Sequence, residues 1–358
     1  MPLTSFLTNG SLRAGHGRQT RGVGDAFEIR PVDLLDEAQT DAAVRWNSVF
    51  DAVQQELFGD QGSEWSLAEL RALQRKPDTK RACFAAWSDG QVVGALHVML
   101  PLRDNLHLAV FWPAVVPAAR KRGIGSALLA TAERVATEHG RSVFLVESER
   151  AGDGPDLAEG FATRRGYVVA QTMLRSEMAL PADASGLRAI MDSAGAEDYA
   201  IESVVDDLPE PWLEDRAVLA QRMSTDAPTD DVDWKEEVWD AERVRAGHEE
   251  MRSAGRRIIE SVARNLPTGR LVGFTRVEVS PESPDRAYQQ DTLVLREHRG
   301  HGLGARLKAA NALLLMEALP TVRAIRTWNA DSNRHMLAVN RALGYAVDGY
   351  SREWQKQV

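Results

Sequence analysis

The chain has 358 residues, enough for two domains that each bury a core of their own. Hydrophobic residues make up 44% of it and charged residues 27%, which is ordinary for a soluble globular protein. The formal net charge of −9 argues against general nucleic-acid binding, which needs a basic face, and suits an enzyme with a cationic acceptor.

Three further features indicate the cellular compartment of the protein. Residues 1–25 are rich in Gly, Arg, Ser and Thr without an apolar core, so we expect a disordered tail rather than a signal peptide. No window reaches the roughly 18 apolar residues of a membrane span. The single cysteine, Cys83, excludes an intramolecular disulfide, and its strand-like setting favours a buried, inert thiol over a nucleophile. We expect a cytoplasmic protein.

The first half, 26–180, predicts a mixed α/β domain. Ser66 with Glu69 predicts a capping box at the start of a helix, and Asp89-Gly90 is typical of a two-residue hairpin turn. Strands are expected at 26–31, 81–88, 91–100, 107–116, 142–147 and 167–180, and helices at 36–57, 66–74, from 124 to about 139, and at 156–165.

After a predicted linker, 181–198, the second half, 199–358, repeats this order. Strands are expected at 199–204, 257–264, 270–279, 287–295, 322–328 and 345–350, and helices within 209–254, from 303 to about 318, and at 333–343. Three landmarks repeat at offsets of 179, 179 and 178: Gly94 with Gly273, Arg120 with Arg299, and Gly166 with Gly344. The sequence therefore predicts a tandem repeat of one mixed α/β domain.

Each half carries the motif Arg-x-x-Gly-x-Gly, at 120–125 and at 299–304, between an expected strand and an expected helix. Two glycines two residues apart let the backbone approach a ligand closely. At a helix N-terminus, the N–H groups and the helix dipole favour an anion such as phosphate. We interpret each motif as a phosphate-binding turn; the alternative is an ordinary strand-to-helix connection.

The repeated unit resembles the GNAT (GCN5-related) acetyltransferases. The resemblance rests on the hairpin, the strand, the Arg-glycine turn and a Gly-Tyr pair about 45 residues further on, once in each half. The tandem layout is similar to that of mycothiol synthase and other actinobacterial two-domain acetyltransferases. The resemblance implies that amides of the turn bind the pyrophosphate of acetyl-CoA and that pantetheine lies where the preceding strand parts from its neighbour. It also implies direct acyl transfer to an amine, without a covalent intermediate.

Carried onto this sequence, the resemblance assigns acetyl-CoA contacts in both halves. In the second half these are main-chain contacts with pantetheine at Val294 and Leu295, pyrophosphate contacts at Arg299, Gly300, His301, Gly302, Leu303 and Gly304, and a contact with the CoA arm at Asn333. In the first half they are Val115, Val116, Arg120, Lys121, Arg122, Gly123, Ile124 and Gly125.

The two halves are not expected to be equivalent. The first half lacks an element like 333–336, and its strand before the turn contains Pro113, which we expect to disrupt the ladder of a central strand. We therefore expect the second half to be catalytic. The first would be a scaffold, or an additional CoA site without turnover.

Candidate catalytic residues depart from the family pattern. An alkylammonium acceptor must lose a proton before it attacks, but the position of the usual base is Gln290, which cannot accept one. Asp291 is the candidate base, although strand alternation would direct it to the opposite face; the alternative is a structural contact. The position of the usual tyrosine acid is Asn340, which can hydrogen-bond the CoA sulfur but cannot deliver a proton at neutral pH. Water, Tyr345 or Tyr350 are alternatives.

An acidic segment with two tryptophans, 226–240, completes the candidates. The resemblance implies that it walls the acceptor site, where carboxylates and aromatic rings suit a cationic amine. The alternative is a solvated acidic loop. The segment lacks the ligand spacing of a calcium loop, so we expect no metal. His298, His301 and His335 are expected at the solvated surface.

Together these features predict an acetyl-CoA-dependent N-acetyltransferase acting on the primary amine of a small molecule, with a cationic molecule as one option for the acceptor. We expect no nucleic-acid or membrane partner, and a monomer or homodimer. Two alternatives remain: a non-catalytic module that senses acyl-CoA, and an enzyme that acylates a peptide or protein amine.

Overall fold

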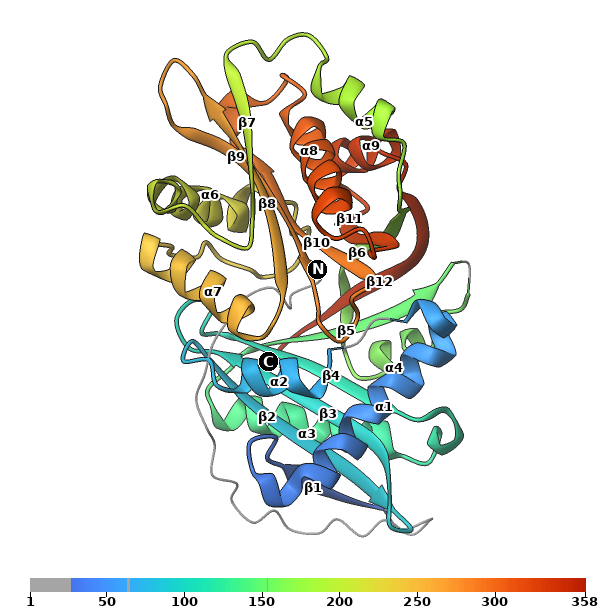
Figure 1. Cartoon of the computed structure of the whole chain (residues 1–358). Helices are drawn as coiled ribbons and strands as arrows, with labels where there is room; N and C mark the ends of the chain where they lie inside the picture. The colour runs from blue at the N-terminus through green and yellow to red at the C-terminus, as the bar shows by residue number, and fades with distance from the viewer. Residues whose placement is uncertain (1–26, 63–64, 153) are drawn as a thin grey trace. The chain divides into compact units, whose positions relative to one another are not determined.

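The computed structural model describes residues 27–62, 65–152 and 154–358, so the expected tail lies outside the described residues. The described chain forms two compact units (Figure 1). The first unit contains residues up to Ala170 together with Arg352–Val358, and the second unit is Gln171–Ser351. Both are mixed α/β units, as the sequence predicts.

The first unit contains a sheet in the order β1-β2-β3-β4-β5-β12. The pairs β1–β2, β2–β3 and β3–β4 are antiparallel, and β4 pairs parallel with β5. Helix α3 packs on one face, and Trp46 of α1 belongs to the apolar cluster of the other. The strands are β1 (Glu28–Val32), β2 (Thr79–Ser88), β3 (Gln91–Pro101), β4 (Leu108–Val115) and β5 (Val143–Ala151). The helices are α1 (Thr40–Phe58), α2 (Leu67–Gln74), α3 (Ile124–Glu138) and α4 (Glu159–Thr163).

The second unit contains a sheet in the order β12-β6-β11-β10-β9-β8-β7. Helices α8 and α9 lie on one face, and α6 and α7 on the other (Figure 1). The strands are β6 (Val168–Ala179), β7 (Tyr199–Val205), β8 (Arg257–Asn265), β9 (Leu271–Val279), β10 (Arg286–Val294), β11 (Ala324–Ala330) and β12 (Ala346–Gln357). The helices are α5 (Ala184–Met191), α6 (Leu213–Asp226), α7 (Ala241–Ser253), α8 (Leu303–Ala318) and α9 (Arg334–Ala342).

The last strand of each sequence repeat continues from one unit into the other. From Gln171 onward β6 belongs to the second unit, and from Arg352 onward β12 belongs to the first. Trp354 is 2% exposed in the first core, and its Nε1 donates to Oγ of Ser148 at 2.8 Å. The C-terminal residues therefore complete the first unit. The sequence repeat is predicted to consist of two domains, 26–180 and 199–358, joined by a linker. That division stays a prediction.

Local sequence patterns predicted several turns and caps correctly. Asp89 and Gly90 both have positive φ, 50° and 75°, as their hairpin requires. Ser66 and Glu69 form the capping box of α2. Cys83 is 3% exposed, and burial raises the pKa of its thiol, which confirms a buried, unreactive side chain.

The repeated glycines of β3 and β9 are required by close packing, against helix α3 at Gly94 and against both strand β10 and helix α8 at Gly273. A Cβ atom on Gly94 would lie 2.9 Å from Cγ2 of Ile124, and one on Gly273 would lie 2.9 Å from the carbonyl oxygen of Leu293. The helix that follows each glycine turn packs against this position, so any side chain there would force it away.

Some predictions about the strands and helices were wrong. Pro113 does not disrupt its strand, because β4 pairs with β3 at this position while its ladder with β5 already ends at Phe111. The missing N–H therefore costs no ladder bond. Strands β5 and β12 extend well beyond the expected 147 and 350, and α4 is shorter than 156–165. Within the described residues, no helix has the length and apolar character to cross a membrane.

Candidate active site

Both glycine turns open a helix with the same backbone geometry. Gly302 is the N-cap of α8 and has φ 67°, and Gly123 is the N-cap of α3 with φ 87°. No side chain caps either helix among the described residues. The first-turn N–H groups are consequently not taken by a capping side chain, and they meet the electrostatic requirement for an anion.

The space beside the two turns differs. Outside its own helix backbone, a Cβ atom on Gly304 would have no atom of the described residues within 4 Å, whereas one on Gly125 would lie 3.5 Å from the ring of Phe161. The guanidinium of Arg165 stacks on Phe161 at 3.7 Å and donates to Ser126. In the first unit, side chains from the α4 region thus cover the start of α3.

Arg299 braces the turn from within the second unit. Its Nε donates to the carbonyl oxygen of Val294 at 3.0 Å, and its Nη2 donates to Asp226 at 2.9 Å. The N–H of Leu295 donates to the carbonyl oxygen of Val272 at 2.9 Å. The side chain of the motif arginine therefore fixes the end of β10 against the end of α6.

The first unit repeats this brace. Nε of Arg120 donates to the carbonyl oxygen of Val115 at 3.1 Å, and Nη1 donates to Glu56 of α1 at 3.0 Å. Both arginines make the same pair of contacts, so the arginine of the motif has a structural role in each half.

Other predicted residues around the second turn have protein partners. The hydroxyl of Tyr199 and Nδ1 of His298 lie 3.0 Å apart, so His298 is half-buried rather than solvated. Nδ1 of His301 lies 2.9 Å from the carbonyl oxygen of Gly195, although His301, like His335, is exposed as expected. Asn333 is the N-cap of α9, where its Oδ1 accepts from the N–H of Met336 at 3.2 Å.

Strand β10 parts from β11 before it reaches the glycine turn. The parallel ladder extends only to the pair Tyr288 and Arg326, yet the strands continue to Val294 and Ala330. The first unit shows the same feature between β4 and β5. Main-chain groups of β10 beyond Tyr288 therefore have no ladder partner in β11.

A β-bulge in β10 determines the direction of Asp291. The side chains of Gln289 and Thr292 both contact the hydroxyl of Thr275, at 2.9 and 2.7 Å, although they are three residues apart. The register against β9 shifts between them. The extra residue breaks the alternation that we expected to separate Gln290 from Asp291. Asp291 lies on the face covered by α6, where Arg216 acts on it.

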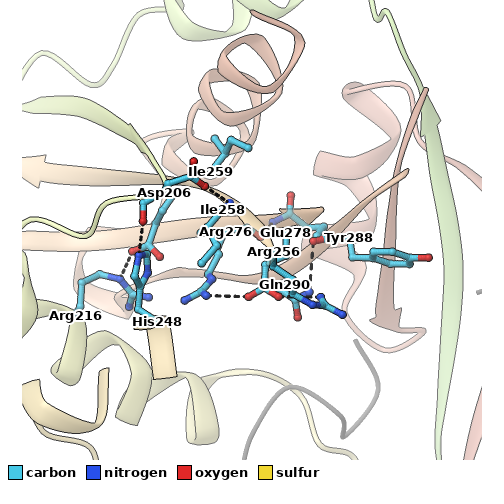
Figure 2. Close-up of polar contacts among 12 residues, drawn as sticks. Asp206, Arg216, His248, Arg256, Ile258, Ile259, Arg276, Glu278, Tyr288 and Gln290 are labelled. Carbon is cyan, nitrogen blue, oxygen red and sulfur yellow. Dashed lines mark hydrogen bonds and ion pairs between the residues drawn. The ribbon is translucent and has the colours of Figure 1, made fainter. Parts of the chain in front are cut away.

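Asp291 is subject to the charges of an ionic cluster on this face, of which Figure 2 labels Arg216, Arg276 and Glu278. Glu260 is fully buried and accepts from Nε of Arg216 at 2.5 Å, while its Oε2 has no hydrogen-bond partner among the described residues. Glu278 pairs with Arg256 and with Arg276, each at 2.9 Å. Two buried carboxylates are thus paired with three arginines near Asp291.

Burial shifts the proton affinities within this cluster. It raises the pKa of Asp291; Glu278 adds to this effect, and Arg216 and Arg276 oppose it. Burial, together with Arg276, lowers the pKa of His248. Nε2 of His248 lies 2.6 Å from the carbonyl oxygen of Asp206 and therefore donates to it. This leaves a buried lone pair on Nδ1, which has no partner among the described residues.

The position of Asn340 is polar but already hydrogen-bonded. Asn340 is 2% exposed; its Oδ1 accepts from Nζ of Lys308 at 2.6 Å and its Nδ2 donates to Asn329 at 2.7 Å. Tyr345, one sequence alternative, is buried in the apolar cluster beneath α8. Sequence patterns did not point to Lys308, Glu260 or His248, because nothing in their neighbouring residues marks them.

The acidic segment 226–240 is mostly engaged within its own unit. Glu237 is 2% exposed and accepts from Nε1 of Trp239 at 2.9 Å, and the guanidinium of Arg243 stacks on this ring at 4.1 Å. Asp240 caps α7. Within the described residues, no group of three or more His, Cys, Asp or Glu side chains could hold a metal ion.

Comparisons with known proteins agree with this geometry. The sequence profile of the Acetyltransferase (GNAT) family matches residues 46–153 and 222–345. A tandem GNAT protein from the clavulanic acid biosynthesis pathway is 25% identical with a TM-score of 0.74, over 93% of this chain and 98% of that one. A GCN5-related N-acetyltransferase from Sphaerobacter thermophilus is 16% identical with a TM-score of 0.64, over 92% and 95% of the chains, which shows the fold alone. No curated protein matches the sequence.

Proposed function

Because the chain belongs to the GNAT acetyltransferase family, we propose that its second unit transfers an acetyl group from acetyl-CoA directly to the primary amine of a small molecule. One observation favours the second unit over the first as the site of catalysis. The space beside Gly304 is open, whereas Phe161 covers the equivalent Gly125. Amides of the turn would hold the pyrophosphate, and pantetheine would follow β10 where it has no ladder partner in β11.

The ionic cluster supports an amine as acceptor. Its carboxylates are balanced by arginines, so the support comes from one atom. The buried Oε2 of Glu260 has no hydrogen-bond partner among the described residues and would accept from an ammonium group before that group loses its proton. A base whose pKa lies above that of an ordinary aspartate accepts this proton more readily. Asp291 is the base in this proposal, and His248, neutral and with a buried lone pair, is the second choice.

The chemistry would proceed in one direct transfer. The amine nitrogen, once neutral, forms a bond to the thioester carbon while the carbon–sulfur bond breaks and the sulfur leaves with the electron pair. Burial strengthens the electrostatic effects of the neighbouring charges on this step. In this proposal the first unit is a scaffold, since the ring of Phe161 lies within van der Waals contact of the space beside Gly125 at the start of α3.

The test is release of free CoA from acetyl-CoA with a panel of small primary amines, with short peptides as a second panel. Turnover with small amines is the expected result, whereas turnover with peptides alone would favour acylation of a peptide or protein amine. Tight CoA binding with no turnover in either panel would favour a sensing module and overturn the proposal.

A further inference from the structure

Lys308 is a buried cation without a carboxylate partner. It lies in α8, is 3% exposed, and donates from Nζ to Oδ1 of Asn340 at 2.6 Å. Its ammonium lies 4.7 Å from the ring centroid of Tyr345. Among the described residues, it forms no ion pair. Burying an ammonium without an opposite charge costs several kcal/mol. A lysine with a purely structural role here would therefore lower the stability of the fold.

The first unit shows that the fold does not need this lysine. At the equivalent position, 179 residues earlier, Leu129 packs in the core at 3% exposure. The position equivalent to Asn340 is Ala162, which is also buried. An apolar pair therefore fills the same place between the same two helices. The polar pair belongs only to the unit whose glycine turn is open.

Lys308 and Asp291 lie on opposite faces of the sheet, near the point where β10 and β11 part. Asp291 faces α6, as its interaction with Arg216 shows. Lys308 belongs to α8 on the other face, and Asn340 links it to Asn329. Asn329 lies in β11 beyond the last residue that pairs with β10. Polar groups thus reach the parted strands from both sides.

This arrangement fits the two proton transfers of the proposed reaction, on which the inference rests. The amine loses a proton on one side of the thioester, and the sulfur that leaves on the other side needs one. An asparagine amide cannot supply it. Among the described residues, Lys308 is the cation that Asn340 holds at this place.

We propose that Lys308 is the general acid that protonates the departing thiolate of CoA, and that Asn340 is a positioning residue for its ammonium. The nitrogen–carbon bond forms, the carbon–sulfur bond breaks, and the sulfur takes its proton from Nζ. Lys308 is left neutral and regains a proton from solvent. The acceptor ammonium gives up two protons, so each turnover releases one proton overall.

The acidity of Lys308 suits this role. Burial lowers the pKa of its ammonium to about 7, and a general acid is most effective when its pKa lies near the working pH. The groups that face it are Asn340 of α9 and the ring of Tyr345. Burial raises the pKa of the Tyr345 hydroxyl, so neither neighbour carries a charge near neutral pH.

The central experiment compares Lys308→Leu, Lys308→Gln and Lys308→Arg with the wild type, using the best amine of the panel. Leucine copies Leu129 and should fold; glutamine is the second neutral variant. We expect kcat to fall about 100- to 1,000-fold in both, with the Kd for CoA within about threefold. The alkaline fall of the wild-type kcat should disappear in both. Arginine keeps the charge but cannot release a proton, so it should not restore kcat.

The matched control is Lys356→Leu. Lys356 also lies over the tyrosine of a Gly-Tyr pair, 5.5 Å from the ring centroid of Tyr167, but it forms an ion pair with Glu133 at 2.9 Å. We expect the kcat of Lys356→Leu to lie within about twofold of the wild type, since Lys356 has no part in the proposed proton transfer between β10 and β11. A loss equal to that of Lys308→Leu would overturn the assignment, as would Lys308→Arg with wild-type kcat.

A second measurement needs no acceptor and uses CoA itself. The thiolate of bound CoA absorbs in the ultraviolet, so its titration can be followed with pH. Lys308 and the thiol can share one proton as an ammonium–thiolate pair, so the thiolate should form at lower pH than in Lys308→Leu or Asn340→Ala. Equal titration in all three proteins would overturn the inference, even if turnover supported the proposed function. Conversely, a shifted titration without turnover would leave Lys308 beside the sulfur and overturn only the proposed function.

Discussion

The carboxylate of Asp226 accepts a hydrogen bond from Nη2 of Arg299 at 2.9 Å, and its side chain is only 4% exposed. This contact holds the glycine turn against the end of α6. We predict that Asp226→Ala destabilises the protein by about 1–2 kcal/mol, since it leaves a charged donor without its partner. It should also weaken CoA binding roughly tenfold. Chemical denaturation and calorimetry would measure the two effects.

The matched control is Glu56→Ala, which removes the equivalent partner of Arg120 in the first unit. It should cost similar stability without changing CoA affinity. Equal losses of affinity in both variants would contradict our choice of the second unit.

Gly304→Leu should abolish CoA binding while the protein still folds. Gly304 lies inside α8, where leucine is a good helix former. Outside its own helix backbone, no atom of the described residues lies within 4 Å of the new Cβ atom. The side chain would enter the space proposed for the phosphates. We expect Kd for CoA to rise more than about 100-fold by calorimetry.

Gly125→Leu is the counterpart in the first unit, where the new side chain meets Phe161. Activity should stay within about threefold of the wild type. Gly302 is a poorer position for this comparison, because its φ of 67° would strain any other residue. If Gly125→Leu alone lost CoA binding, the roles of the two units would be reversed.

Asp291→Asn should lower kcat/KM by about 100- to 10,000-fold, because an amide cannot accept the proton of the acceptor. In the wild type, kcat/KM should rise with pH as Asp291 ionises. Its midpoint should lie above that of an ordinary aspartate, since burial raises this pKa. In Asp291→Asn, kcat/KM should no longer rise with pH in this range. If His248→Gln removed it while Asp291→Asn kept it, the base would be His248.

Glu353 gives a prediction about stability in the first unit. It lies in the C-terminal part of β12 at 1% exposure, and burial, reinforced by Glu149, raises the pKa of its carboxyl to about 8. Because the folded pKa exceeds the unfolded one, its contribution to stability is full below about pH 4.5 and is lost as pH rises through about 8. Glu353→Gln should therefore be more stable than the wild type at pH 9, by on the order of 5 kcal/mol, and about equal at pH 4.

Urea denaturation at both pH values would measure this difference. Glu138→Gln is the control, since Glu138 is 56% exposed in an (i,i+4) pair with Arg134. It should change stability by less than about 0.5 kcal/mol at either pH. A pH-independent effect of Glu353→Gln would show that its carboxyl has the same pKa in the folded and unfolded protein, which would contradict the prediction.

The sequence by itself determined the features that depend on neighbouring residues. The hairpin at Asp89-Gly90 and the capping box at Ser66 follow from local backbone geometry, and the two glycine turns follow from the strand and helix patterns on either side. The repeat offset of 179 then made the family resemblance specific, because two copies of one motif in register are far more informative than one.

Only the tertiary structure decided how distant segments combine. A single-residue bulge between Gln289 and Thr292 turns Asp291 toward α6, and alternation along the sequence predicts the opposite face. Lys308 and Asn340 are 32 residues apart and meet only when α8 packs beside α9. Trp354 completes a core formed by residues more than 180 positions earlier. Such contacts depend on how helices and strands pack against one another. The free energy of that packing cannot be read from a local pattern of residues.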